Sequence, residues 1–118
     1  MGSMREAYEK IGADYDGASV RLMGEEMLAR FALKFLDDES MDKFEAAMAA
    51  GDAESAFMAV HTLKGVSQNL GFDNLYEPAV VVTEALRNAD TVDGARDGMH
   101  ALRQQYAATM SALREAAE

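Results

Sequence analysis

Cysteine and tryptophan are both absent from the 118-residue sequence. Without cysteine the chain can form neither a disulfide framework nor a thiolate metal site. Proline occurs once, at Pro78, and β-branched residues gather only at positions 80–82. Because proline and β-branched residues are poorly suited to helix, their scarcity favours an all-α fold.

Long apolar runs are also lacking. No stretch approaches the roughly 20 residues that cross a bilayer, and the start of the chain has no apolar segment typical of a signal peptide. Basic residues are the minority, with 11 Lys and Arg against 21 Asp and Glu. The net charge of −10 argues against nucleic acid, which is bound by clustered cations. We therefore expect a cytoplasmic protein that binds neither membrane nor nucleic acid.

The apolar share of 49% is enough for one core, and the length fits a single folded unit. We interpret 1–18 as an N-terminal arm with a short helix and 19–118 as a helical bundle. In the arm, Ser3 and Glu6 have the spacing of a capping box, and Gly12 is placed to end the helix.

Capping residues and glycines divide the rest of the chain into helices with short loops. Short loops imply antiparallel neighbours, so we predict an up-and-down antiparallel four-helix bundle with one or two additional N-terminal helical segments. The helices are expected at 19–38 with a break at Gly24, 41–50 capped by Ser40, 53–70 capped by Asp52, about 74–89 and about 93–116. Pro78 leaves two alternatives, a late start of its helix or a kink. Two apolar stripes are expected to face the core: Val20, Met23, Met27, Phe31 and Phe35, and Met99, Leu102, Tyr106, Met110 and Leu113.

The helix at 53–70 has two distinct faces, because each residue turns the side chain by about 100°. The mainly apolar arc, expected to be buried, contains Ala56, Ala59, Val60, Leu63, Val66, Ser67 and Leu70. A second stripe, made of His61, Lys64, Gly65 and Gln68, points roughly 160° away from the middle of that arc. We therefore expect His61 to be reachable from solvent.

An exposed imidazole beside a cation is suited to accept a phosphoryl group from another protein. Lys64 lies one turn from His61 and can reach phosphate oxygens. Gly65 destabilises the helix by about 1 kcal/mol relative to Ala. We therefore expect a reason for glycine here, either close packing or free access of a partner to the surface beside His61. Gln68 can hydrogen-bond the ring or a partner, and Phe57, one turn before His61, is best explained as an interface anchor.

The segment from His61 to Gly71 resembles the His-x-x-Lys-Gly signature of histidine-containing phosphotransfer (Hpt) domains, and the resemblance extends over about residues 12–116. It implies that His61 accepts a phosphoryl group from a receiver-domain aspartate and passes it to another receiver aspartate. It also implies no kinase activity and no cofactor, since Mg²⁺ is supplied by the receiver. The expected partners are response-regulator receiver domains and a hybrid histidine kinase, and we expect a monomer.

The resemblance also assigns roles to individual residues. His61 is the phosphoacceptor, Lys64 contacts the phosphate, and no metal ligand is expected. Receiver docking is assigned to Phe57, Thr62, Gly65 and Gln68. Many family members hold the imidazole with Glu or Gln on the facing helix, where this sequence has Thr83 followed by Glu84. Gln68 and Thr83 are therefore the candidates for orienting the ring.

Other interpretations of the sequence stay open. The phosphoacceptor domain of a sensor kinase also displays a helical histidine, but an acidic residue normally follows it, whereas Thr62 follows His61. A domain excised from a hybrid or chemotaxis kinase would look the same as this chain. A helical adaptor that binds through Phe57 without chemistry belongs to a different class. We interpret His100 as ordinary surface, and Asp14–Gly17 lacks the later ligands of a calcium loop.

Overall fold

The computed structural model describes residues 3–118, which form helices joined by short loops. The α-helices are α1 (Met4–Ile11), α2 (Tyr15–Arg21), α3 (Glu25–Lys34), α4 (Ser40–Ala50), α5 (Ala53–Asn69), α6 (Asp73–Leu86) and α7 (Met99–Ala117), and two 3-10 helices are η1 (Phe35–Asp37) and η2 (Asp93–Gly98). No strand occurs within residues 3–118, which confirms the all-α prediction.

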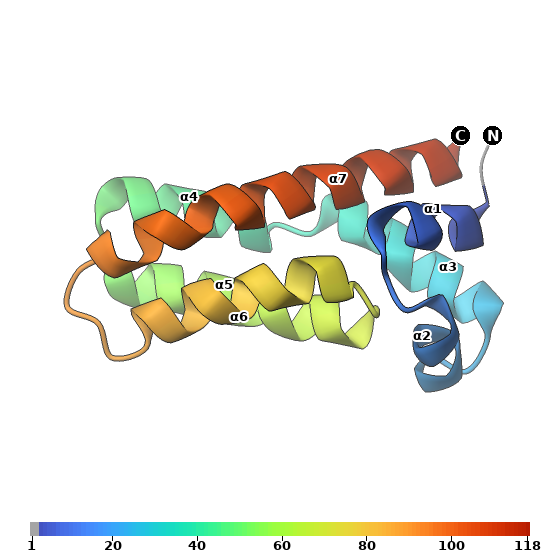
Figure 1. Cartoon of the computed structure of the whole chain (residues 1–118), viewed down its shortest axis with the longest axis horizontal. Coiled ribbons are helices and arrows are strands. Elements are labelled where there is room, and N and C mark those ends of the chain that lie inside the picture. Colours follow the sequence, from blue (N-terminus) through green and yellow to red (C-terminus); the bar gives the residue numbers. More distant parts are fainter. Residues whose placement is uncertain (1–2) are drawn as a thin grey trace.

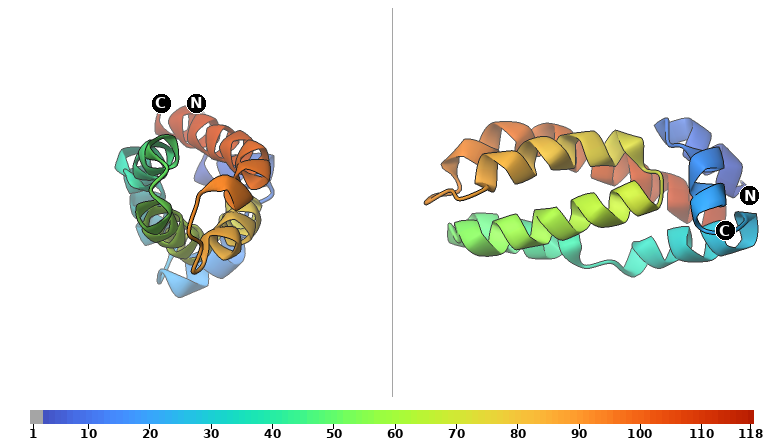
Figure 2. Two further views of the ribbon diagram at one scale, coloured as in Figure 1. Left: turned by 90° about the vertical axis from the view of Figure 1, so that its left-hand side faces the viewer. Right: turned by 90° about the horizontal axis from the view of Figure 1, so that it is seen from below.

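The long helices α4, α5, α6 and α7 run along the longest dimension of a 43 × 24 × 20 Å molecule (Figure 1). Successive helices run in opposite directions, and α5 packs against both α4 and α6. The shorter helices α1, α2 and α3 gather at the end where α7 finishes, as the view from below also shows (Figure 2). None of the described helices combines the length and the apolar character needed to cross a membrane.

The predicted helix caps at Ser3 and Asp52 are confirmed. The Ser3 hydroxyl accepts a hydrogen bond from the Glu6 N–H at 3.1 Å, and the Ser3 N–H donates to the Glu6 carboxylate. The Asp52 carboxylate caps α5 by accepting from the Ser55 N–H at 3.1 Å and the Ser55 hydroxyl at 2.7 Å. These bonds to Ser55 lower the pKa of Asp52, because they favour the charged carboxylate.

One helix start differs from the prediction, and at another the structure decides between the two alternatives. Ser40 is the first residue of α4 rather than its cap, and its N–H donates to the Asp38 carboxylate at 2.8 Å. The carboxylate that accepts a hydrogen bond from a backbone N–H at the start of α4 is therefore that of Asp38, and the predicted Ser40 cap is wrong. The helix α6 begins at Asp73 and contains Pro78 in its interior, so the late-start alternative is wrong.

The predicted apolar stripe in the α2–α3 region is wrong for most of its residues. Val20 is 82% exposed and Met23 is 89% exposed, and α3 buries Leu28 and Ala32 instead of Phe31. The helical backbone is interrupted at Met23 and Gly24, which both have positive φ. A single helical period therefore cannot continue from α2 into α3. The stripe of α7 is confirmed: Met99, Leu102, Met110 and Leu113 are buried and Tyr106 packs at the edge of the core.

The N-terminal arm is part of the core. Tyr8 is fully buried, with ring contacts to Phe72 and Tyr15, and α1 packs against α7. The helix α2 runs through the boundary that we placed between residues 18 and 19, so that boundary falls inside a helix.

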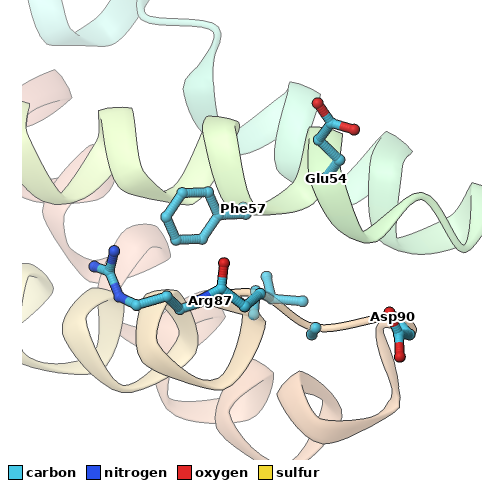
Figure 3. Close-up of a pocket in the computed structure, with 7 residues that line it drawn as sticks. Glu54, Phe57, Arg87 and Asp90 are labelled. Atoms are coloured by element: carbon cyan, nitrogen blue, oxygen red, sulfur yellow. The ribbon is translucent and has the colours of Figure 1, made fainter.

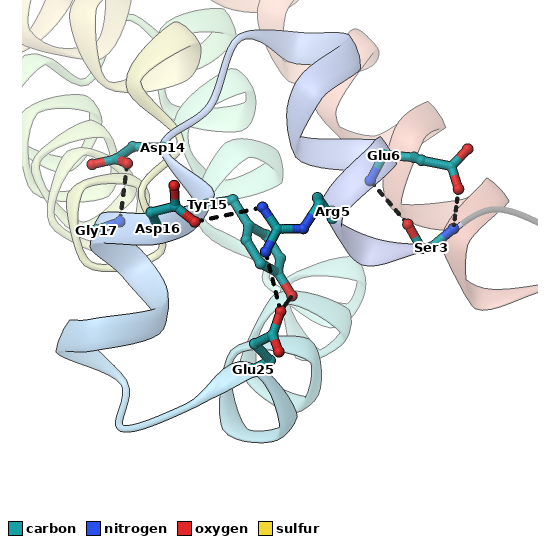
Figure 4. A network of polar contacts seen from close by, with 8 residues as sticks. All are labelled: Ser3, Arg5, Glu6, Asp14, Tyr15, Asp16, Gly17 and Glu25. Carbon is teal, nitrogen blue, oxygen red and sulfur yellow. Dashed lines mark hydrogen bonds and ion pairs between the residues drawn. The ribbon is translucent and has the colours of Figure 1, made fainter.

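Polar contacts also join α1, α2 and α3 (Figure 4). The Arg5 guanidinium lies over the Tyr15 ring and contacts the carboxylates of Asp16 and Glu25, and the Tyr15 hydroxyl donates to Glu25 at 2.9 Å. Asp14 caps α2 by accepting from the Gly17 N–H at 3.0 Å, which gives this acidic stretch a structural role.

Candidate functional site

The predicted orientation of α5 is confirmed. Its core arc is buried except for Val66, which is partly exposed. His61, Thr62, Gly65 and Gln68 are exposed, and Lys64 is half-buried. The sequence therefore brings the histidine and the lysine to one open face of the bundle.

Gly65 occupies open space. A Cβ atom added there would meet no heavy atom within 4 Å outside its own helix, so internal packing does not require glycine. The packing explanation is therefore excluded for a side chain as small as alanine. The surface beside His61 and Lys64 is therefore open at this position.

Phe57 lies between the core and the His61 face. It is half-buried and packs against the core, and its ring centroid is 5.6 Å from that of His61 at an interplanar angle of 42°. Sequence reasoning placed Phe57 on the exposed stripe, whereas only part of the ring is open to a partner. Thr62 is exposed, and its hydroxyl donates to the Met58 carbonyl at 3.0 Å.

The two candidates for orienting the ring differ in placement. Thr83 is fully buried, and its hydroxyl donates to the Ala79 carbonyl at 2.7 Å within α6. A buried hydroxyl that donates within its own helix is poorly placed to hold a solvent-facing ring, which argues against that assignment for Thr83. Gln68 is exposed on the same face as His61. Among the hydrogen bonds of residues 3–118, none involves the His61 ring.

Glu84, the residue after Thr83, is an acidic residue on the facing helix α6. Its carboxylate takes three contacts from Arg87, two at 3.2 Å to Nε and one at 2.9 Å to Nη2. The pKa of Glu84 is lowered mainly by the hydrogen bonds from Arg87 and further by the charges of Lys64 and His61. Glu84 therefore interacts electrostatically with Lys64 and His61. Its pairing with Arg87 had a signal in the sequence, the i, i+3 spacing of the two residues.

Arg87 is the C-cap residue directly after α6, and its side chain reaches back toward α5. Its Cζ atom is 5.2 Å from the centroid of the Phe57 ring, a cation–π contact. In Figure 3 the guanidinium points past Phe57 and away from Asp90. These residues border a hollow of about 470 Å³, whose lining also includes Glu54 and the loop that follows Arg87.

Further hollows flank the other side of α5. One lies between α5 and α4 and includes Met58 and Thr62. Another lies between α5 and α3 and includes Phe31 and Val66. Met58 and Phe31 are exposed apolar residues, and sequence reasoning missed both as parts of this surface. They add exposed apolar area on the α4 and α3 sides of α5.

Within residues 3–118, no three His, Asp or Glu side chains are grouped so that they could hold a metal ion. The absence of a metal and a cofactor of its own stays a prediction from the sequence.

Comparison with known proteins assigns the chain to one family. The profile of the Hpt domain family matches residues 26–116, which run from the first turn of α3 to the last turn of α7 and include all of α5. No curated protein and no solved structure was found to match the chain. Since the family match covers most of the chain and the whole bundle, the chain belongs to the Hpt domain family, whose members carry out histidine phosphotransfer in phosphorelays.

Proposed function

We propose that this chain is a phosphorelay intermediate in which His61 accepts a phosphoryl group from the aspartate of one receiver domain and passes it to the aspartate of another. The observation that carries the proposal is the exposed position of His61 on α5, with Lys64 beside it and open space at Gly65. A receiver must bring its aspartyl phosphate within bonding distance of the ring. A side chain at position 65 would stand in that approach.

The chemistry needs little from the chain beyond a nucleophile and a cation. The lone pair of a neutral His61 nitrogen forms the N–P bond while the O–P bond to the receiver carboxylate breaks, and the bonding electrons leave on that carboxylate. The other ring nitrogen keeps its proton. Lys64 would contact a phosphoryl oxygen, and Mg²⁺ in the receiver would neutralise charge during the in-line displacement.

Docking would use the surface around the ring. The exposed side chains of Thr62 and Gln68 and the open part of Phe57 surround the histidine. We extend the predicted docking surface by Met58 and Phe31, the exposed apolar residues on the α4 and α3 sides. The proposed partners are response-regulator receiver domains and a hybrid histidine kinase, and the proposed setting is a cytoplasmic monomer without kinase activity.

The direct test is to incubate the chain with phosphorylated receiver domains and to look for protein-bound phosphate that is labile in acid and stable in alkali. The label should disappear in His61→Gln and persist in His100→Gln, a matched control because His100 is also an exposed helical histidine. Gly65→Arg should keep its helix content and accept phosphate at least about 100-fold more slowly, as expected for a displaced reacting group. A wild-type chain that no cognate receiver labels would favour the adaptor interpretation.

A further inference from the structure

All the sulfur of the chain is in methionine, because the sequence has nine methionines and no cysteine. Within residues 3–118, two methionine side chains are exposed: Met23 is 89% exposed and Met58 is 60% exposed. The other methionines of that range are buried or half-buried. Since oxidation of methionine depends on access to its sulfur, a peroxide in solution should react first at Met23 and Met58.

Met58 lies close to the phosphoacceptor on α5. It is three residues before His61, so the two side chains leave the helix about 60° apart around its axis. Met58 lines the hollow of about 440 Å³ between α4 and α5, together with Lys43 and Thr62. Thr62 directly follows His61, and its hydroxyl donates to the Met58 carbonyl at 3.0 Å. The exposed Met58 side chain therefore belongs to the surface on which a receiver would meet His61.

Oxidation makes a methionine side chain polar. A lone pair of the thioether sulfur forms a bond to one oxygen of hydrogen peroxide, the O–O bond breaks, and the other oxygen leaves as hydroxide and takes up the remaining proton to form water. The sulfur is oxidised by two electrons and the peroxide is reduced. In the free chain a sulfoxide at the exposed Met58 stays hydrated, whereas a receiver that covers the hollow would have to remove its oxygen from water.

We propose that Met58 is a modification site at which oxidation by peroxide reversibly weakens the docking of receiver domains, while His61 keeps its reactivity. This inference rests on the proposed function of His61. Methionine sulfoxide reductases reverse the modification: a dithiol is oxidised to a disulfide, and the sulfoxide oxygen leaves as water. Met23 provides an internal comparison, because it is more exposed than Met58 but lies between α2 and α3, outside α5 and its hollow.

The experiment measures phosphotransfer before and after oxidation. The chain is treated with hydrogen peroxide, the excess is removed with catalase, and mass spectrometry of its peptides locates the added oxygen. At low receiver concentration, we expect transfer from a phosphorylated receiver to slow about three- to tenfold, because an apolar methionine contact is lost. The loss should lie in the receiver concentration that gives half the maximal rate and not in the maximal rate itself.

Phosphoramidate is the small donor against which the receiver is compared. It transfers its phosphoryl group to His61 and releases ammonia, and it needs no docking surface. Its rate of labelling should be equal in the treated and the untreated chain. An equal slowing with both donors would mean that peroxide damages His61 or the fold, and the docking role of Met58 would be wrong.

Two leucine variants locate the effect, each compared with its own untreated sample. Met58→Leu has an apolar side chain that peroxide does not oxidise, so its transfer from the receiver should not change on treatment, although Met23 is oxidised. Met23→Leu is the matched control, and its transfer should slow as in the wild type. Treatment of the oxidised wild type with methionine sulfoxide reductases for both sulfoxide epimers should restore the rate.

The outcomes separate this inference from the function on which it rests. The role of Met58 is overturned, and the relay proposal left intact, by a Met58 that peroxide does not oxidise, by a Met58 sulfoxide that leaves transfer unchanged, or by an equal loss in wild type and Met58→Leu. An untreated chain in which no receiver labels His61 overturns both. Circular dichroism of each treated and untreated sample checks that the bundle is folded.

Discussion

The helix α5 has two regions that differ in how they are held. At its C-terminal end, the last carbonyls are bound by the N-terminal segment: Tyr8 donates to Leu70 at 2.7 Å, and Arg21 donates to Gln68 and Asn69 at 3.0 and 3.1 Å. Around His61, the neighbouring side chains are exposed or half-buried, and their contacts are ion pairs and ring contacts at the surface. Hydrogen bonds from the N-terminal segment thus hold the end of α5, whereas the face around His61 is open to solvent.

The hydrogen bonds that hold the C-terminal end of α5, which we call the clamp, come from residues outside the family match. Residues 3–25 precede the matched region, and yet they supply Tyr8, the Asp14 N–H that donates to the Gly71 carbonyl at 2.8 Å, and Arg21. Carbonyls at a helix end have no partner within the helix, so these donors replace water there. The N-terminal segment therefore fixes the helix that carries His61 without approaching the ring itself.

Of the substitutions that test this comparison, truncation of Tyr8 should have the largest effect on the free energy of unfolding. Tyr8→Ala removes a fully buried ring and the hydrogen bond to Leu70, and the free energy of unfolding should fall by about 3–5 kcal/mol. Urea unfolding measures the loss. At a temperature where the variant is folded, labelling of His61 by phosphoramidate should keep its wild-type rate, because the clamp does not touch the ring.

Phe57→Ala is the matched control in the other region. It also removes an aromatic ring, but one that is half-buried, so the loss of stability should be smaller, about 1–2 kcal/mol. Transfer from a receiver should slow more in Phe57→Ala than in Tyr8→Ala. If the slower transfer occurs in Tyr8→Ala instead, the division between a stabilising end and a functional middle is wrong.

Gly71 and Gly65 offer a comparison with smaller expected effects and opposite signs. Gly71 has φ +75°, and an added Cβ would lie 2.6 Å from the Asp14 carbonyl oxygen, whereas Gly65 is helical and its Cβ would meet nothing. Gly71→Ala should lower the free energy of unfolding by at least about 1–2 kcal/mol. Gly65→Ala should raise it by about 0.5–1 kcal/mol, the difference in helix propensity.

Thermal unfolding of the two glycine variants checks both signs. A loss of stability in Gly65→Ala would mean that the backbone near His61 needs glycine for its own conformation, and the access explanation would then fail. An unchanged Gly71→Ala would show that the N-terminal segment can move away from α5 at little cost.

The features that sequence predicted correctly depend on neighbours along the chain. The capping box of Ser3 and Glu6, the cap at Asp52 and the buried arc of α5 all follow from residues a few positions apart. The exposure of His61 follows from the same arc. Local patterns are sufficient here because a helix fixes the relative directions of its own side chains.

The features that sequence did not predict depend on distant segments or on ambiguous periodicity. In α3 both Met27 with Phe31 and Leu28 with Ala32 form apolar lines, and only packing against the core selects the second line. Arg21 reaches carbonyls 47 and 48 positions away, and no local pattern encodes that contact. The Glu84–Arg87 pair had a local signal, but its position against Phe57 depends on how α6 packs on α5.

The last predicted effect concerns alkaline pH and again distinguishes the clamp from the open face. Burial raises the pKa of Tyr8 well above its ordinary value, so the folded chain keeps the phenol protonated where the unfolded chain releases the proton. Above about pH 10 the unfolded state then binds fewer protons than the folded state, and stability falls as pH rises, by at most about 1.4 kcal/mol per pH unit for this group. Tyr8→Phe lacks the phenol and should lose less stability between about pH 9 and about pH 11, although it starts about 1 kcal/mol lower without the bond to Leu70. Urea unfolding at the two pH values measures the difference, and equal alkaline losses in both proteins would show that the Tyr8 hydroxyl can leave the Leu70 carbonyl and ionise in the folded state.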